Sequence, residues 1–173
     1  LVGSEMCIRD SYLLGALDGF ENSQPVEFDE MPELEKWLAA RLHELDTIVT
    51  EKVNAYDFHS VFTELHDFCN SDLSAFYFDI RKDMLYCDSL NSMPRRSTLI
   101  MMERCFKSLV AWIAPILCFT ADEAWLAYSK DPEDSIHLHE YQKMPDEWQN
   151  ASLIHKWKKV RSIRSKVTAA LES

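Results

Sequence analysis

The chain has 173 residues, with 18 Lys or Arg against 29 Asp or Glu, which gives a formal net charge of −11. This charge excludes a protein that does nothing but bind nucleic acid, because such proteins are basic overall. A hydrophobic content of 47% is enough to build one buried core, and only three Gly and six Pro favour long helices over many short strands.

The five cysteines are too scattered to form a redox motif or a zinc ribbon. They are Cys7, Cys69, Cys87, Cys105 and Cys118, and no two of them stand as C-x-x-C. The pattern predicts a reducing compartment and buried structural thiols. No apolar run approaches the roughly 20 residues that span a membrane, since Pro115 interrupts the best candidate at 109–119.

The first eleven residues, LVGSEMCIRDS, lack the basic and apolar regions of a signal peptide. They resemble a translated sequencing adaptor, so we expect residues 1–11 to be non-native. The predicted domain is 12–173, as a fragment of a longer chain. Residues 12–20 read as the tail of a helix.

Two long helices are predicted next. Leu34, Leu38, Leu42, Leu45 and Val53 recur at helical spacing, and Pro32 suits the first turn of that helix. Asp57 is the expected cap of the second helix. Its apolar stripe runs from Val61 to Ile80, and the helix is predicted to reach about Tyr86.

The remaining elements follow a connector at 88–94. Helical spacing from Leu99 to Ile113 predicts a third helix that stops before Pro115. Thr120-Ala-Asp-Glu123 reads as a capping box, which predicts a short helix at 121–128. Residues 129–149 are expected to be irregular. A last helix carries the apolar stripe Leu153, Trp157, Val160, Val167 and Leu171. The sum is an all-α antiparallel bundle of about five helices.

No catalytic or metal site can be read from the chain. The phosphate-binding Gly motifs and the nucleophile elbow are absent. Glu64, His66 and Asp67 lack the Glu-x-x-His pairing of a bundle di-metal site. Cys69, among large apolar residues, is expected to be core.

Basic residues gather in two islands, at 81–107 and 156–166, while 18–57 is mainly acidic. In the first island Arg81 and Lys82 lie near Tyr86, and Arg95 and Arg96 open the next helix. Guanidinium groups pair with phosphate and aromatic rings stack on unpaired bases, so this island suits RNA in a loop. The alternative is a solvated helix end whose cations offset the helix dipole.

Several stretches together resemble the C-terminal helical domain of isoleucyl-tRNA synthetases, which are class I aminoacyl-tRNA synthetases. The stretches are YLLGALDGF (12–20), FHSVFTELHDFCNSDLSAFYFDIRKDMLYCD (58–88), RRSTL (95–99), LVAWIAPILCFTADEAW (109–125), IHLHEY (136–141) and WKKVRSIRSKVTAALE (157–172). The similarity covers the chain from Tyr12 onward in unbroken order.

This resemblance implies the anticodon-stem-binding part of an enzyme that uses ATP to attach isoleucine to its tRNA. The family's His-x-Gly-His and Lys-Met-Ser-Lys-Ser motifs are not in this chain. The resemblance therefore implies no cofactor for this part of the enzyme. ATP with Mg, and in many members Zn, would belong to other parts of the parent. The implied partners are isoleucine tRNA and the catalytic body of the same enzyme, in the cytoplasm and without a membrane.

The expected RNA-facing residues are Arg81, Lys82, Tyr86, Arg95 and Arg96, with Lys158 and Lys166 as secondary candidates. Asp79 and Asp83 could instead tie these cations into pairs within the helix. The resemblance makes Thr120, Asp122, Glu123 and Trp125 cap and core residues.

Two alternatives stay open at this point. The bundle could belong to a sister synthetase of the valyl, leucyl or methionyl type. It could also be a protein–protein interaction module whose basic islands meet acidic partners.

Overall fold

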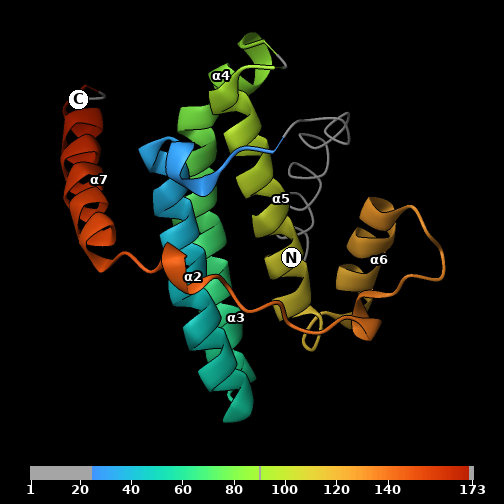
Figure 1. The fold of residues 1–173 in the computed structure, drawn as a ribbon. Coiled ribbons are helices and arrows are strands. Elements are labelled where there is room, and N and C mark those ends of the chain that lie inside the picture. The colour runs from blue at the N-terminus through green and yellow to red at the C-terminus, as the bar shows by residue number, and fades with distance from the viewer. Residues whose placement is uncertain (1–24, 90, 172–173) are drawn as a thin grey trace.

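The computed structural model describes residues 25–89 and 91–171, and within these ranges every regular element is a helix (Figure 1). The α-helices are α2 (Glu33–Asn54), α3 (Phe58–Asp67), α4 (Asp79–Cys87), α5 (Met93–Ile113), α6 (Cys118–Ser129) and α7 (Ala151–Leu171). A π-helical stretch, η3 (Phe68–Phe78), joins α3 to α4, and single 3-10 turns lie at η2 (Phe28–Glu30), η4 (Ile136–Leu138) and η5 (Asp146–Trp148). With α3, η3 and α4 counted as one rod, the predicted bundle of about five helices is confirmed. The expectations for residues 1–11 and 12–20 lie outside the described residues.

Large side chains from α2, η3 and α5 make the core. The largest fully buried ones are Trp37, Trp112, Tyr77, Phe68 and Phe106. Trp37 meets Phe76 edge to face at a centroid distance of 5.1 Å. Cys69 and Cys105 are buried as predicted, but Cys87 and Cys118 are exposed, so the prediction of buried thiols is wrong for these two.

Helix α2 buries the predicted stripe and ends in a strained turn. Leu34, Leu38, Leu42 and Leu45 are all buried. At the end of the helix Tyr56 has φ 57°, a left-handed conformation in which glycine is usual. The N–H of Asp57 donates to the carbonyl oxygen of Lys52 at 2.9 Å across this turn. The Asp57 carboxylate then accepts from the Ser60 N–H at 3.2 Å, which confirms the predicted cap of α3.

The rod formed by α3, η3 and α4 ends at Cys87, one residue beyond the predicted limit. Its π-helical centre was not predicted, and it changes which residues face the core. A π-helix bonds each N–H five residues back, so the chain turns less per residue than in an α-helix. The three consecutive residues Phe76, Tyr77 and Phe78 are buried, whereas Ile80 is 37% exposed. The prediction that Ile80 continues the apolar stripe is therefore wrong.

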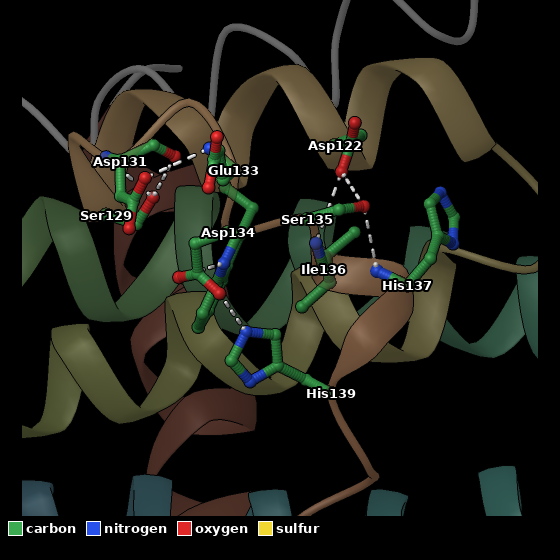
Figure 2. Close-up of polar contacts among 10 residues, drawn as sticks. Asp122, Ser129, Asp131, Glu133, Asp134, Ser135, Ile136, His137 and His139 are labelled. Atoms are coloured by element: carbon green, nitrogen blue, oxygen red, sulfur yellow. Dashed lines mark hydrogen bonds and ion pairs between the residues drawn. The ribbon is translucent and has the colours of Figure 1, made fainter.

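Helix α6 begins at Cys118, two residues before Thr120, and no side chain caps it. The predicted capping box is wrong because Thr120 lies inside the helix and not at its N-cap, and Asp122 bonds another segment. Figure 2 shows the Asp122 carboxylate facing the loop that follows α6, where it accepts from Ser135 Oγ at 2.6 Å and from the Ile136 N–H at 3.2 Å. Trp125 is buried, as expected. These bonds fold the irregular segment back onto α6.

Two contacts of Asp134 complete that attachment. Its carboxylate lies 2.6 Å from His139 Nε2 and accepts from Trp125 Nε1 at 3.0 Å (Figure 2 draws the first). The rings of Trp125 and His139 are 4.7 Å apart. Hydrogen bonds from His139 and then Trp125 lower the pKa of Asp134. The loop is thus held by ionic and aromatic contacts around one half-buried carboxylate.

Helix α7 lies on the flank of α2 away from α5 (Figure 1). It does not bury its predicted stripe: Leu153 is buried and Trp157 half-buried, but Val160, Val167 and Leu171 are exposed. Arg161 and Arg164 face the bundle instead. The guanidinium of Arg161 lies over the ring of Phe76 at 4.9 Å and pairs with Asp72 of η3. α7 is therefore attached by Leu153 and Trp157 at its start and by arginines further on, where the apolar stripe is open to solvent.

Candidate RNA-binding surface

Helix α4 presents two distinct faces. Leu85 is buried, and Arg81, four residues earlier on the same face, has only 15% of its side chain exposed. Lys82 and Tyr86 share the outer face, where Tyr86 is 76% exposed. The outer face therefore offers a cation one helical turn from an exposed aromatic ring.

Arg81 is held in the interior by a buried carboxylate. Its Nη2 donates to Glu35 Oε2 at 2.5 Å, and the side chain of Glu35 is 0% exposed. Glu35 also accepts from Thr98 Oγ1 at 2.8 Å and from the Tyr77 hydroxyl at 3.3 Å. Burial, and then the charge of Glu35, raise the pKa of Tyr77 well above its usual value, so the phenol remains a donor. This geometry does not favour the predicted RNA contact for Arg81.

Lys82 lies in an ion pair that also reaches α7. Its Nζ donates to Asp79 Oδ1 at 3.0 Å, the pairing within the helix that the sequence left open. The other oxygen of Asp79 accepts from Arg164. Hydrogen bonds from Lys82 and then Arg164 lower the pKa of Asp79, and the bond to Asp79 raises the pKa of Lys82. Asp79 thus brings the second basic island beside the first.

The first turn of α5 carries two half-buried arginines and no acidic residue. Arg95 Nη1 donates to the carbonyl oxygen of Asp88 at 2.6 Å, which ties the connector to the helix. The buried Nε atoms of Arg95 and Arg96 have no hydrogen-bond partner among the described residues. Two guanidinium groups at the positive end of a helix dipole create a site of positive potential that an anion would stabilise.

The secondary candidates lie on α7. Lys158 and Lys166 are exposed, whereas Arg161 and Arg164 are half-buried and bond the backbone of η3. Arg164 contacts the start of α4, which places Lys166 at the same end of the bundle as Lys82. Lys158 lies two turns earlier along α7. The structure therefore brings Lys82, Tyr86, Arg95, Arg96 and Lys166 to one end.

Three buried carboxylates were not predicted from the sequence: Glu35, Asp72 and Asp46, which accepts from the Met144 N–H at 3.1 Å. Asp72 in η3 accepts from Arg41 Nε at 2.9 Å and also pairs with Arg161. Glu35 stands four residues before Ala39 and seven before Leu42, both fully buried. This spacing on the apolar side of α2 was a readable signal that Glu35 is internal. The same signal exists for Asp72, which lies four residues after Phe68 and four before Phe76, both buried.

Comparison with known proteins identifies the family. Residues 35–173 match the family described as the anticodon-binding domain of tRNA ligase. The chain belongs to this family. The matched range of this anticodon-binding domain starts at Glu35 and includes all of α3 to α7.

Relatives that match this anticodon-binding domain are named isoleucine–tRNA ligases. The protein of Agrobacterium fabrum is 46% identical over 161 residues, which are 93% of the chain and 16% of the relative. Those of Bartonella henselae and Zymomonas mobilis are 43% and 44% identical, with 93% of the chain covered in each case and 16% and 18% of the relatives. The chain therefore spans about a sixth of the length of these curated relatives.

Neither a metal site nor a membrane-spanning helix is found in the part of the chain that the structure describes. In 25–89 and 91–171, no three His, Cys, Asp or Glu side chains gather in a way that could hold a metal ion. None of the described helices combines the length and the apolar character needed to cross a membrane.

Proposed function

We propose that this domain binds the anticodon stem-loop of isoleucine tRNA on behalf of an isoleucine–tRNA ligase. The family and the names of the relatives support this proposal. The observation that carries it is the end of the bundle where α4 meets α5. We call this surface the α4–α5 corner and define it by Lys82, Tyr86, Arg95 and Arg96.

The corner combines the groups that RNA loops require. Lys82 and the two arginines supply charge-assisted donors for phosphate oxygens. The exposed ring of Tyr86 is available for stacking on an unpaired base. The overall negative charge of the chain keeps RNA away from other surfaces, so the basic residues also orient the encounter.

The domain itself would hold RNA and carry out no chemistry. The parent would use ATP and Mg to activate isoleucine, and zinc would belong to a separate tail, in a cytoplasmic enzyme. The His-x-Gly-His and Lys-Met-Ser-Lys-Ser signatures are not part of this sequence, so its residues do not fit an ATP site. We therefore assign no step with ATP to this chain.

The test is binding of the chain to isoleucine tRNA and to a non-cognate tRNA at two salt concentrations. If the domain neutralises about six phosphates, affinity should fall by roughly 10³-fold or more between 50 and 200 mM salt. Changing Lys82 or Arg96 to Ala should weaken binding and reduce the slope of log affinity against log salt by about one for each phosphate that is no longer neutralised. Preference for isoleucine tRNA would support the assignment of the amino acid.

A matched control is Lys143→Ala. Lys143 is 76% exposed and forms an i,i+3 pair with Asp146, as Lys82 does with Asp79. This variant removes the same charge away from the corner and should bind as the wild type does. Absence of RNA binding at low salt by the folded chain would overturn the proposal in favour of a protein–protein module. Preference for a valine, leucine or methionine tRNA would favour a sister synthetase.

A further inference from the structure

Glu35 is a fully buried carboxylate that joins four parts of the fold. It belongs to α2 and accepts from Arg81 of α4, Thr98 of α5 and Tyr77 of η3. Thr98 and Tyr77 are themselves fully buried. Glu35 lies in the first turn of α2, where the positive end of the helix dipole adds to its stabilisation.

The need for a charge at this position is not explained by stability alone. Burying an ion pair costs desolvation on both sides, and well-packed apolar side chains in its place are often equally stable or more stable. Such a pair is directional, whereas apolar packing is not. It therefore fixes how the helices that it joins are rotated relative to one another.

The partners of Glu35 are placed where rotation matters most for the corner. Arg81 immediately precedes Lys82, so its inward bond turns Lys82 outward, and Tyr86 with it. Thr98 lies three residues after Arg95, so its bond sets the direction of the first turn of α5. One buried carboxylate therefore sets the orientation of both helices that carry the corner.

We propose that Glu35 is the positioning residue of the α4–α5 corner, holding Lys82 and Tyr86 in register with Arg95 and Arg96 for one RNA ligand. This inference rests on the proposed function. Glu35 itself would not contact RNA, because its side chain is completely enclosed.

The first test compares Glu35→Gln with Glu33→Gln. Both changes remove one negative charge from the first turn of α2, but Glu33 is exposed and pairs with Lys156. Glu35→Gln keeps an acceptor for Thr98 and removes the ionic partner of Arg81. We expect Glu35→Gln to weaken tRNA binding about tenfold, measured well below its Tm, and to reduce the salt slope by about one to two units. Glu33→Gln should leave both quantities at the wild-type value.

The second test separates position from stability. In Glu35→Gln/Arg81→Met no guanidinium remains buried and residue 81 has no donor, so the Tm should lie above that of Glu35→Gln. RNA affinity and salt slope should stay low, because the directional link is still missing. Recovery of affinity together with Tm would overturn the proposal and make Glu35 a stabilising residue only.

A third measurement does not depend on RNA. In Glu35→Gln, amide hydrogen exchange should accelerate in residues 79–89 and 93–99 while α6 stays protected. Uniform acceleration, or none, would overturn the positioning role. A wild-type chain that binds no RNA would overturn the proposed function. Faster exchange confined to residues 79–89 and 93–99 would still show that Glu35 positions the corner.

Discussion

At the scale of single residues, exposure separates groups that support the corner from groups that can meet a ligand. Arg81 and Lys82 are neighbours of the same charge type, yet one is turned to Glu35 and the other to solvent. Sequence alone does not distinguish them. The difference arises because η3 determines which residues of α4 face the core.

Changing Tyr86 is expected to lower RNA affinity without changing the stability of the domain. Since its ring is 76% exposed and stacking of one base contributes about 1–3 kcal/mol, Tyr86→Ala should lower RNA affinity about tenfold with Tm unchanged. Affinity by fluorescence anisotropy and Tm by circular dichroism would check this. Tyr56→Ala removes a ring of similar exposure, 83%, at the other end of the bundle and should bind as the wild type does. Equal losses in both variants would contradict a stacking role.

The bonds of Asp79 predict that the stability of the fold depends on pH in the acid range. Its pKa is lowered by Lys82 and Arg164, so its bonds contribute stability that is complete above about pH 5 and is lost as pH falls through the folded-state pKa. Stability should therefore fall more steeply from about pH 5 to pH 2 in the wild type than in Asp79→Asn. Urea unfolding at each pH measures the difference between the two chains. Parallel curves would show that Asp79 does not contribute.

At the scale of elements, α7 departs furthest from what the sequence predicts. A stripe of apolar residues at helical spacing predicts the buried face, and that rule succeeded for α2 and α5. It failed for α7 because the surface beside it presents carboxylates, Asp72 and Asp79, and carbonyl oxygens from η3. Arginines satisfy such a surface and apolar residues do not. Only the tertiary neighbour decides which side of α7 turns inward.

Asp72 is the main attachment point of α7. It is 5% exposed and pairs with both Arg41 and Arg161, so Asp72→Asn leaves two cations without their buried carboxylate. We expect a loss of about 3 kcal/mol in the free energy of unfolding. Urea denaturation checks the value. Val160→Ser, on the exposed stripe, should change stability by less than about 0.5 kcal/mol, and an equal effect would contradict this view of the interface.

At the scale of the whole molecule, most of the fold could be predicted and the site only in part. Helix order and the extents of α2 and α5 follow from periodicity and Pro, and the start of α3 follows from Asp57. The π-helical register of η3 could not be predicted, because it depends on packing and not on a local signal. That register decides that Ile80 is exposed and that Arg81 faces the core. The basic islands were visible in the sequence, but their meeting through Asp79 is a property of the folded chain.

The strained turn at Tyr56 lies at the far end of α2 from Glu35 (Figure 1). Between them run almost all of the 22 residues of that helix, a distance of about 30 Å at 1.5 Å per residue. Tyr56 is 83% exposed and its side chain has no place in the core. If Cys7, Cys87 and Cys118 are first replaced by Ser, a dye or a biotin group attached through a cysteine at position 56 would report on or immobilise the domain without obstructing the α4–α5 corner. The turn is thus a suitable attachment site for single-molecule and surface-based measurements on this domain.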